Sequence, residues 1–274
     1  MKIVTWNING IRARLPIVLN WLKKNQPDIL GLQEIKCLEE NFPKMEFEDL
    51  GYNVEILGQK GFNGVALLSK LPFDEITYGF EGSKTATLEK EQARLIEGVF
   101  STENGVVWVC NIYLPNGNPV NNPENTGTFS DKFTYKLNWM NRLNEFVKER
   151  LTYEEPFILM GDFNIIPSPI DCHNPKAWWG DALYRTESQE KFRTLSNMGM
   201  VDALRAVSEE PNYSFWDFQA GAWRKNSGIR IDFLMLSPQA VDNLEYVKTH
   251  SEARALERPS DHVPIEGGFS FRQT

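Results

Sequence analysis

Residues 157–164 run from four apolar side chains directly into Gly161, Asp162, Phe163 and Asn164. The apolar run predicts a buried strand, and Gly161 permits a bend or a close approach of another group. Asp162 and Asn164 lie two residues apart, so their side chains share one face of an extended chain. A carboxylate and an amide at a strand end suit metal binding, water activation or polarisation of a phosphoryl oxygen. The alternative is a structural turn, because Gly, Asp and Asn are common turn residues.

Two earlier predicted strands also end in polar side chains. Residues 2–7 and 29–33 read as strands that run into Asn7 and Glu34, and residues 11–24 between them have the apolar spacing of a helix. A strand-helix-strand order favours a parallel pair whose C-terminal ends lie side by side. We therefore expect Asn7 and Glu34 to be neighbours.

The polar residues at predicted strand ends form an oxygen-rich set with a single histidine. The set is Asn7, Glu34, Tyr113, Asn116, Asp162, Asn164, Asp232, Ser260, Asp261 and His262. Such donors suit Mg²⁺ or Mn²⁺, whereas a zinc site would require more His or Cys. The sequence has neither a G-x-x-x-x-G-K nor a G-x-G-x-x-G motif, so no nucleotide cofactor is indicated.

His262 needs an orienting partner if it is to hold a reacting group. Neighbouring residues on a strand point to opposite faces, so Asp261 is not expected to be that partner. Asp232 is the candidate, because it interrupts an apolar run and a buried carboxylate needs a compensating group. The alternative for His262 is a purely structural histidine.

Aromatic and cationic side chains are mixed between residues 213 and 230. They are Tyr213, Phe215, Trp216, Phe218, Trp223, Arg224, Lys225 and Arg230. Aromatics beside cations suit stacking or wedging at nucleic-acid bases with phosphate contacts alongside. Core packing explains the aromatics equally well, but it does not explain the cations.

Composition predicts an ordinary globular protein. The 274 residues are 41% hydrophobic and 12% aromatic, and with no repeat or linker we expect one domain over residues 1–274. The net charge of -8 argues against a generic polyanion-binding surface, so a nuclease would need a local basic face. We predict that face from Arg12, Arg14, Lys36, Lys60, Arg224 and Lys225. The 3 cysteines are far apart, which indicates free thiols.

The chain begins with a predicted strand, without the apolar region of a signal peptide, and has no apolar stretch of membrane-spanning length. We expect a monomer in the cytoplasm that makes no membrane contact and associates with the nucleoid when it acts.

The remaining elements predict an α/β fold. Strand-like runs at 52–57, 64–69, 94–100 and 106–113 look like an antiparallel meander, and later strands are expected at 229–236, 246–250 and 262–271. Helices are expected at 132–151 and 187–197, and irregular segments at 117–131 and 172–186. Strands outnumber helices, which favours two facing β-sheets with helices on the outside and the polar strand ends along one rim.

Seven short blocks, spread over essentially the whole chain, form a specific pattern. They are Trp6-Asn7-Ile8-Asn9-Gly10, Leu32-Gln33-Glu34, Asn63-Gly64-Val65, Tyr113-Leu114-Pro115-Asn116, Gly161-Asp162-Phe163-Asn164, Arg230-Ile231-Asp232 and Ser260-Asp261-His262. In this order they resemble the exonuclease III family of abasic-site endonucleases, within the endonuclease/exonuclease/phosphatase superfamily. The resemblance implies a four-layer α/β sandwich with two facing mixed sheets. It also implies metal-dependent hydrolysis 5′ to an abasic site in double-stranded DNA, usually with 3′-phosphodiesterase activity on blocked 3′ sites and 3′ to 5′ exonuclease activity.

The resemblance further implies roles for matching residues. The catalytic group is Tyr113, Asp162, Asn164, Asp232 and His262. In it, Asp162 resembles the group that activates the attacking water and Asn164 the one that orients it. The metal-site group is Asn7, Glu34, Asp162, Asn164, Asp261 and His262, with Glu34 as the main ligand. The DNA-binding group is Arg94, Asn116, Phe215, Trp216, Asn226, Ile229 and Ile231. Of these, Phe215, Ile229 and Ile231 fall where the family lines a pocket for the extruded sugar.

Three questions stay open. Asn9 stands where certain relatives have an aspartate near a second metal site, so the number of metal ions is open. A superfamily phosphoesterase that acts on inositol phosphates or sphingolipids is the nearest alternative function, and it would not need Phe215, Trp216 and Asn226. A catalytically inactive binding protein on the same scaffold is the second alternative.

Overall fold

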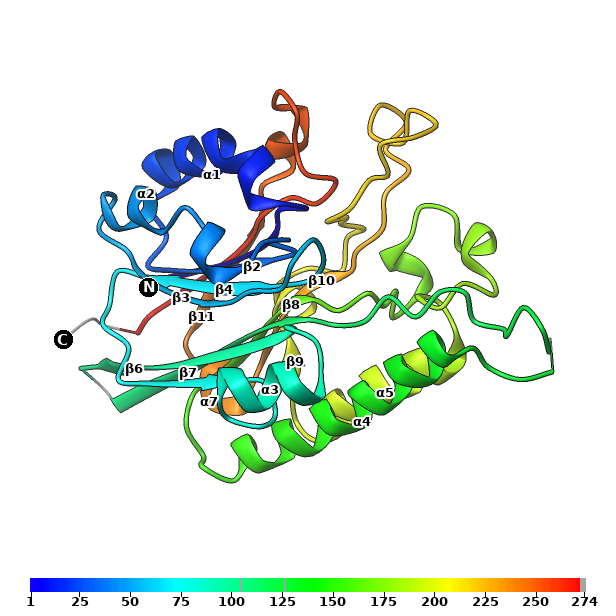
Figure 1. The fold of residues 1–274 in the computed structure, drawn as a ribbon, viewed down its shortest axis with the longest axis horizontal. Helices are drawn as coiled ribbons and strands as arrows, with labels where there is room; N and C mark the ends of the chain where they lie inside the picture. Colours follow the sequence, from blue (N-terminus) through cyan, green and yellow to red (C-terminus); the bar gives the residue numbers. More distant parts are fainter. Residues whose placement is uncertain (104, 126, 272–274) are drawn as a thin grey trace.

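The chain folds into two six-stranded β-sheets that face each other, with helices on their outer sides (Figure 1). This arrangement is seen in a computed structural model that describes residues 1–103, 105–125 and 127–271. It confirms the predicted α/β sandwich. The ends of the strands in these two sheets position the polar residues.

The first sheet has the strand order β11-β12-β1-β2-β4-β3. Its strands are β1 (Lys2–Asn7), β2 (Ile29–Gln33), β3 (Asn53–Leu57), β4 (Val65–Ser69), β11 (Leu244–Thr249) and β12 (Ile265–Phe269). β1 and β2 are parallel, with Asn7 in register with Gln33, as the strand-helix-strand order predicts. The pairs β12 with β1, β11 with β12, β2 with β4 and β3 with β4 are antiparallel.

The second sheet has the order β5-β6-β7-β8-β10-β9. Its strands are β5 (Glu75–Tyr78), β6 (Leu95–Thr102), β7 (Gly105–Tyr113), β8 (Phe157–Asp162), β9 (Val201–Asp202) and β10 (Asp232–Leu236). β7 and β8 are parallel, and Tyr113 is in register with Asp162. Each sheet therefore has one parallel pair, and the helix that connects each pair is α1 (Ile11–Asn25) or α4 (Asp131–Leu151).

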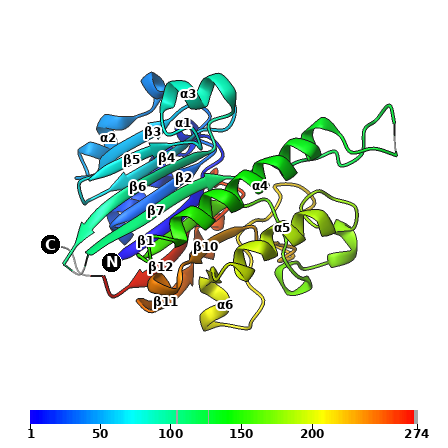
Figure 2. The ribbon, with the colours of Figure 1, turned by 90° about the horizontal axis from the view of Figure 1, so that it is seen from below.

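The helices cover the outer faces of the sheets (Figure 1). α1 and α2 (Lys44–Glu48) lie over the first sheet, and α4 and α5 (Thr186–Asn197) lie side by side along the second, as Figure 2 also shows. The shorter helices are α3 (Lys84–Lys90), α6 (Ala203–Val207) and α7 (Pro238–Val241), with 3₁₀ turns η1 (Glu39–Asn41), η2 (Pro169–Asp171), η3 (Pro175–Trp178) and η4 (Ser251–Ala255). None of the helices within the described ranges is both long and apolar enough to cross a membrane.

Two apolar layers hold these parts together. The larger one fills the space between the sheets and under α1, with Val18 and Leu22 from the helix buried in it. The second lies between the other sheet and its two helices, where Trp139 of α4 and Phe192 of α5 are buried. Burial of such side chains stabilises a fold by about 1.5 to 3 kcal/mol each, so the two layers fix the helices firmly on the sheets.

A buried polar contact also fixes one sheet against the other. Gln33 Nε2, at the end of β2, donates to Asn111 Oδ1 of β7 at 2.5 Å and to Thr5 Oγ1 at 2.8 Å. Asn111 Nδ2 in turn donates across the interface to the carbonyl oxygens of Leu32, at 3.0 Å, and Ala66, at 2.9 Å. Because an unpaired buried amide is costly, these bonds favour one alignment of the two sheets.

Gly161 makes the close approach of strands that its sequence position suggests. Its φ is 146°, and a Cβ atom there would lie 2.0 Å from the carbonyl oxygen of Ile112 on the neighbouring strand. A larger residue would push β7 and β8 apart just before Asp162. Glycine at this position therefore sets the place of the carboxylate that follows it.

The predicted meander over residues 52–113 is wrong, because these strands are divided between the two sheets. β3 and β4 belong to the first sheet, and the chain then crosses to β5, which starts the second. β5 was not expected: its 4 residues alternate between polar and apolar types, but so short a segment is a weak signal. The strand expected over 229–236 begins only at Asp232, since Ile229 makes isolated bridges with Cys172 and Phe215 instead.

Candidate active site and metal centre

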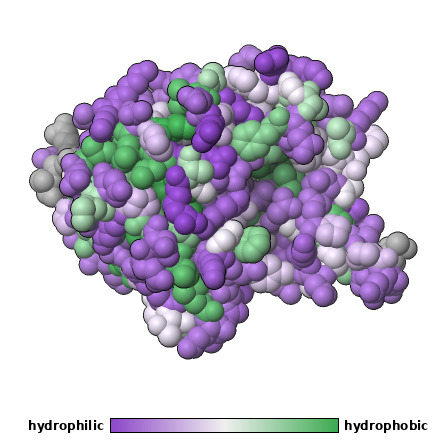
Figure 3. Space-filling view, turned by 45° about the horizontal axis from the view of Figure 1, so that its top comes forward, coloured by the Kyte–Doolittle hydropathy of each residue, from purple (hydrophilic) through white to green (hydrophobic). Residues whose placement is uncertain are grey.

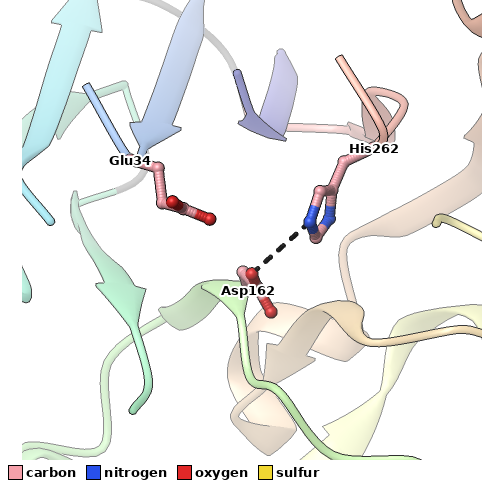
Figure 4. Close-up of side chains that lie close together, drawn as sticks. All are labelled: Glu34, Asp162 and His262. Atoms are coloured by element: carbon pink, nitrogen blue, oxygen red, sulfur yellow. Dashed lines mark ion pairs between the residues drawn. The ribbon is translucent and has the colours of Figure 1, made fainter. Parts of the chain in front are cut away.

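Three ionisable side chains from distant parts of the sequence meet where the strands of the two sheets end (Figure 4). Glu34, Asp162 and His262 each offer one ligand atom, and these atoms lie within 4.8 Å of one another. Glu34 follows β2 of the first sheet, Asp162 ends β8 of the second, and His262 precedes β12. The structure therefore brings together on one rim residues that sequence analysis placed at separate strand ends.

Asn7 joins the two carboxylates of this group. Its Nδ2 atom donates to Glu34 Oε1 at 2.9 Å and to Asp162 Oδ2 at 2.8 Å. Its Oδ1 accepts from the backbone N–H of Asn9 at 3.0 Å, which fixes the amide orientation. Asn7 is the last residue of β1, so the predicted neighbourhood of Asn7 and Glu34 is confirmed.

His262 has the partner predicted from strand alternation. Its Nδ1 lies 2.8 Å from Asp232 Oδ2, and its Nε2 lies 3.7 Å from Asp162 Oδ2. Burial alone would lower the pKa of His262, but the carboxylates of Asp232 and Asp162 outweigh it and raise the pKa above its usual value. These two carboxylates favour the protonated form of the imidazole.

The preceding residues fix this histidine to the first sheet. Ser260 Oγ donates to the carbonyl of Asn7 at 2.7 Å, and the indole N–H of Trp6 donates to the carbonyl of His262 at 3.2 Å. Asp261 Oδ1 accepts from Asn9 Nδ2 at 3.1 Å, which places a further carboxylate beside the group.

Asp162 is fully buried among other charged groups. Burial raises its pKa, the charge of Asp232 adds to the rise, and His262 opposes it. The Glu34 carboxylate stands beside it, so the described residues supply more negative than positive charge here. A hard divalent cation would offset this imbalance, and the carboxylate and amide oxygens present are the ligands that such a cation prefers.

Glu34 remains ionised despite its partial burial. Burial would raise its pKa, but Lys36, whose Nζ lies 2.8 Å from Glu34 Oε2, and the amide of Asn7 lower the pKa below its usual value.

Glu34 has a φ of 50° and Asn164 a φ of 48°, both in the left-handed region. Non-glycine residues in this region cost on the order of 1 kcal/mol each, and such conformations concentrate at functional sites.

Asn164 is bound from several sides. Its backbone N–H donates to Asp162 Oδ1 at 2.9 Å, and its Nδ2 donates to the carbonyl of Leu114 at 2.8 Å. Its Oδ1 accepts from Asn116 Nδ2 at 3.3 Å. The bond from the Asn164 N–H to Asp162 Oδ1 is the structural turn that was the alternative prediction, because the chain is no longer extended after Asp162. This turn brings Asn164 next to Asn116, which follows β7.

Tyr113 lies beside the carboxylates and over a buried arginine. Burial and the charges of Glu34 and Asp162 raise the pKa of Tyr113 well above its usual value, so its hydroxyl remains a hydrogen-bond donor. The Arg94 guanidinium lies 4.8 Å from the Tyr113 ring centroid and donates to the Tyr113 carbonyl at 3.0 Å. Arg94 is 8% exposed, so most of its contacts are within the protein.

An aromatic and aliphatic cluster borders the histidine. The ring of Phe215 lies 5.0 Å from that of His262 at an angle of 66°. Phe215 also packs against a cluster that contains Ile229 and Ile231, with Trp178 added from the 172–186 segment. Both isoleucines are 2% exposed, so only the edge of this cluster faces solvent.

The residue after Phe215 is a buried tryptophan that is hydrogen-bonded to an exposed asparagine. Trp216 is 3% exposed, and its indole N–H donates at 3.1 Å to Oδ1 of Asn226, which is exposed. Arg224 and Lys225 are exposed on the same loop. The loop thus presents an amide and two cations, with the tryptophan beneath them.

Part of the predicted basic face forms a groove. Arg12, Lys36 and Lys60 line a depression of about 200 Å³ beside Cys37. Arg14 lies next to Lys36, since both approach Gly10 and Arg14 donates to the carbonyl of Asn9 at 2.6 Å. The space-filling view shows a surface that is mostly hydrophilic, with a hollow that has hydrophobic residues inside it (Figure 3).

One buried cation near the site escaped the sequence analysis. Lys136 of α4 is 0% exposed, and its ammonium donates to the carbonyl of Asn164 at 2.7 Å. The available signal was its spacing, because Lys136 lies three residues after Phe133 and four before Met140 on the apolar stripe of the helix. A lysine inside such a stripe indicates a buried polar partner.

The chain is similar in sequence and in structure to known nucleases. The profile of the Endonuclease/Exonuclease/phosphatase family matches residues 4–262. Exodeoxyribonuclease III of Haemophilus influenzae is 34% identical over 277 residues, covering 98% of this chain and 100% of that protein. A solved 3′ phosphatase from Neisseria, bound to a product DNA hairpin, superposes with a TM-score of 0.89 at 35% identity, over 98% of this chain and 99% of its own. An AP endonuclease from Archaeoglobus fulgidus gives a TM-score of 0.88 at 32% identity, with the same coverage. The chain therefore belongs to the endonuclease/exonuclease/phosphatase family.

Proposed function

We propose that this protein is a metal-dependent DNA repair phosphodiesterase. It cleaves the phosphodiester 5′ to an abasic site in double-stranded DNA, removes groups from blocked 3′ ends and degrades DNA from 3′ to 5′. We further propose that it acts as a monomer and as one domain. The observation that carries this proposal is the convergence of Glu34, Asp162 and His262 within 4.8 Å on one rim. The activities of the relatives agree with it.

The proposed cation is Mg²⁺ or Mn²⁺. Glu34 would be its main ligand, and the amides and acids that border the position are Asn7, Asp162, Asn164 and Asp261. His262 also borders the position, and its Nε2 would be a ligand only when the imidazole is neutral. When bound, such a cation offsets negative charge on the phosphate and on the leaving oxygen. The negative charge shared by Glu34 and Asp162 supports this assignment.

Asp162 is the proposed general base. It takes a proton from the attacking water, and burial and the charge of Asp232 both favour the protonated carboxyl that results. Asn164 lies beside it and orients that water. Attack occurs in line with the bond to the leaving oxygen.

His262 and Tyr113 are the proposed donors to the phosphate oxygens. Asp232 binds Nδ1 of His262 at 2.8 Å, so the protonated Nε2 is free to donate to the substrate. Donors held in place before the reaction stabilise the transition state without reorganisation, and loss of one typically costs about 10²- to 10³-fold in rate.

The surrounding residues are proposed to bind DNA. Phe215, Ile229 and Ile231 would form the apolar wall against the extruded sugar, which an intact nucleotide cannot enter. Asn116 and Asn226 are exposed amides suited to phosphate contacts, with Trp216 beneath Asn226. Arg94 is proposed to contribute positive charge under Tyr113.

The proposal is tested with a duplex that carries a single abasic analogue. Wild-type protein should cleave it only when Mg²⁺ or Mn²⁺ is present and should not hydrolyse a phosphoinositide. The Asp162→Asn variant should bind the duplex but lose about 10²-fold or more of the cleavage rate, roughly 3 kcal/mol of transition-state stabilisation. Near-normal turnover by Asp162→Asn, or hydrolysis of the phosphoinositide alone, would refute the proposal.

A further inference from the structure

Lys136 is buried next to the proposed active site, where its ammonium group binds three loops. Its Nζ atom donates to the backbone carbonyls of Asn164 at 2.7 Å, Asn116 at 3.0 Å and Ala182 at 3.2 Å. The side chain is 0% exposed. Burial lowers the pKa of Lys136 to about 7, against the opposing effect of Asp181 and Asp162. A buried amine is costly, so apolar packing alone does not account for a lysine here.

The three carbonyls belong to three separate segments of the rim. Asn116 follows β7, Asn164 follows β8, and Ala182 lies in the irregular 172–186 segment. Backbone carbonyls outside regular structure need donors, and one ammonium group supplies all three of these. Lys136 is therefore a common attachment point for loops that have no shared strand or helix.

A second residue ties two of these segments together, the loop after β7 and the 172–186 segment. Asn118 Nδ2 donates to Asn116 Oδ1 at 3.0 Å and to Asp181 Oδ1 at 3.1 Å. Asn118 Oδ1 accepts from the backbone N–H of Ala182 at 3.0 Å. Trp178, which opens this turn, packs on the cluster of Phe215 and the two isoleucines. The wall of the proposed sugar pocket is thus connected through Ala182 and Lys136 to Asn164.

The lysine stem is enclosed as closely as its head group. Gly117 has a φ of +89°, and a Cβ atom there would lie 2.6 Å from Cδ of Lys136. The loop after Asn116 can therefore approach the lysine only because residue 117 is a glycine. The glycine thus lets this loop pack directly against the aliphatic part of Lys136, below the three carbonyls.

We propose that Lys136 is a positioning residue, which holds the backbone of Asn116 and Asn164 so that their amide side chains face the scissile phosphate in one arrangement. This inference rests on the proposed function of the site. Lys136 is buried and does not touch substrate, so its effect reaches the reaction only through the loops it binds. Its removal should lower the rate of the chemical step more than the affinity for DNA.

The test compares Lys136→Met with wild type and with Lys148→Met, an exposed lysine on the same helix. Methionine keeps the unbranched stem and removes the donors. Cleavage of the abasic duplex should slow about 10- to 100-fold, as for other residues that orient a catalytic group, with a change in KM below about threefold. Lys148→Met should cleave at the wild-type rate.

A double substitution separates positioning from general damage to the fold. If Lys136 acts through Asn164, adding Lys136→Met to Asn164→Ala should slow cleavage by less than about threefold. Lys136→Gln, whose amide still donates hydrogen bonds, should retain more activity than Lys136→Met, and it serves in its place if the methionine variant does not fold. Wild-type rates in a folded variant, a loss confined to KM, or losses that multiply with Asn164→Ala would overturn the inference.

One readout does not depend on cleavage. Lys136→Met or Lys136→Gln should accelerate hydrogen exchange at the backbone N–H of Ala182, because the segment that carries it loses its attachment to α4. Unchanged exchange there would also overturn the inference. If wild type fails to cleave the abasic duplex, the proposed function is wrong, and exchange at Ala182 still decides whether Lys136 fastens these loops.

Discussion

The rings of Phe215 and His262 are in contact. Their centroids are 5.0 Å apart in an edge-to-face arrangement, and their backbones form an isolated bridge. Such ring pairs contribute about 0.5 to 1.5 kcal/mol beyond the area that they bury. Phe215 therefore has two tasks in the proposed site, since it supports the imidazole and borders the pocket for the sugar.

Phe215→Ala separates these tasks. Loss of the pocket wall should slow cleavage at an abasic site by about tenfold or more, as for other apolar contacts in a pocket. Removal of nucleotides from a paired 3′ end does not require that pocket and should slow less. Both rates can be measured on duplexes that differ only in the abasic analogue.

The matched control is Phe218→Ala, which removes an aromatic ring that is 51% exposed on the same loop. This variant should have only a small effect, and the same effect, on cleavage at the abasic site and on removal of nucleotides from the 3′ end. Equal losses of both activities in Phe215→Ala would show that the ring serves His262 alone.

Some residue-level features are predictable from sequence because they follow from alternation along a strand. The choice of Asp232 over Asp261 as the partner of His262 needs no more than the opposite orientation of adjacent side chains. Lys136 was missed for the opposite reason. Its partners are backbone carbonyls from three loops. Every residue has such a carbonyl, so the sequence does not show which ones bind the lysine.

A network of ion pairs holds the segment that leads into β10. Arg230 donates through Nε to Asp171 Oδ1 at 2.7 Å and forms a second ion pair with Asp202 at 2.7 Å. Arg205 of α6 also binds Asp171 at 2.7 Å. The network joins η2, β9 and α6 to the residues before Asp232, and so it places Ile229 and Ile231 as well.

Asp171→Asn should destabilise the fold by about 1.5 to 3 kcal/mol near neutral pH, because the buried Arg230 loses one of its two charged partners and keeps Asp202. Burial would raise the pKa of Asp171, but Arg230 and Arg205 outweigh it and lower the pKa. The wild-type carboxylate therefore stabilises the folded state fully above the usual aspartate pKa of about 3.9. This stabilisation is lost as the pH falls through the lower pKa of the folded state.

Urea unfolding of both proteins between pH 7 and pH 3 measures this difference. The gap in free energy of unfolding should be largest at neutral pH and should narrow at the acidic end. Asp74→Asn, at an exposed position, provides the control and should leave the free energy nearly unchanged at each pH. A constant gap would show that the Asp171 charge does not contribute.

Elements with strong periodicity were predicted well, and the division of strands between sheets was not. α1 and α4 follow their apolar stripes to within one residue of the expected ends. The crossing from β4 to β5 left no signal, because antiparallel neighbours in one sheet and strands in two facing sheets have similar local patterns. Only the packing of one sheet on the other distinguishes these arrangements.

Charge is unevenly distributed over the whole molecule. The chain has a net charge of -8, yet Arg12, Lys36 and Lys60 line one groove beside the proposed active site. Long-range attraction to DNA is therefore weak or unfavourable, and binding depends on a few local cations. We expect affinity to respond strongly to the loss of any one of them.

Lys60→Ala tests this expectation. Binding of the abasic duplex should weaken about tenfold at low salt, and the slope of log Kd against log salt should fall by about 1 because one fewer counterion is released. Fluorescence anisotropy across a salt series measures both quantities. Lys148→Ala, at an exposed site of α4, should change neither, and an equal effect of both variants would show that the groove is not special.

The pairing of β12 with β1 brings together parts of the chain that are made at different times. Ser260 binds Asn7 across 253 positions of sequence, and His262 follows two residues later. At ordinary rates of translation this separation corresponds to about 10 to 50 s. Throughout that interval a ribosome-bound chain exposes Asn7 and Glu34 without the imidazole that completes the group. The rim group therefore cannot be completed until the 253 positions that separate Asn7 from Ser260, and then His262, have been made.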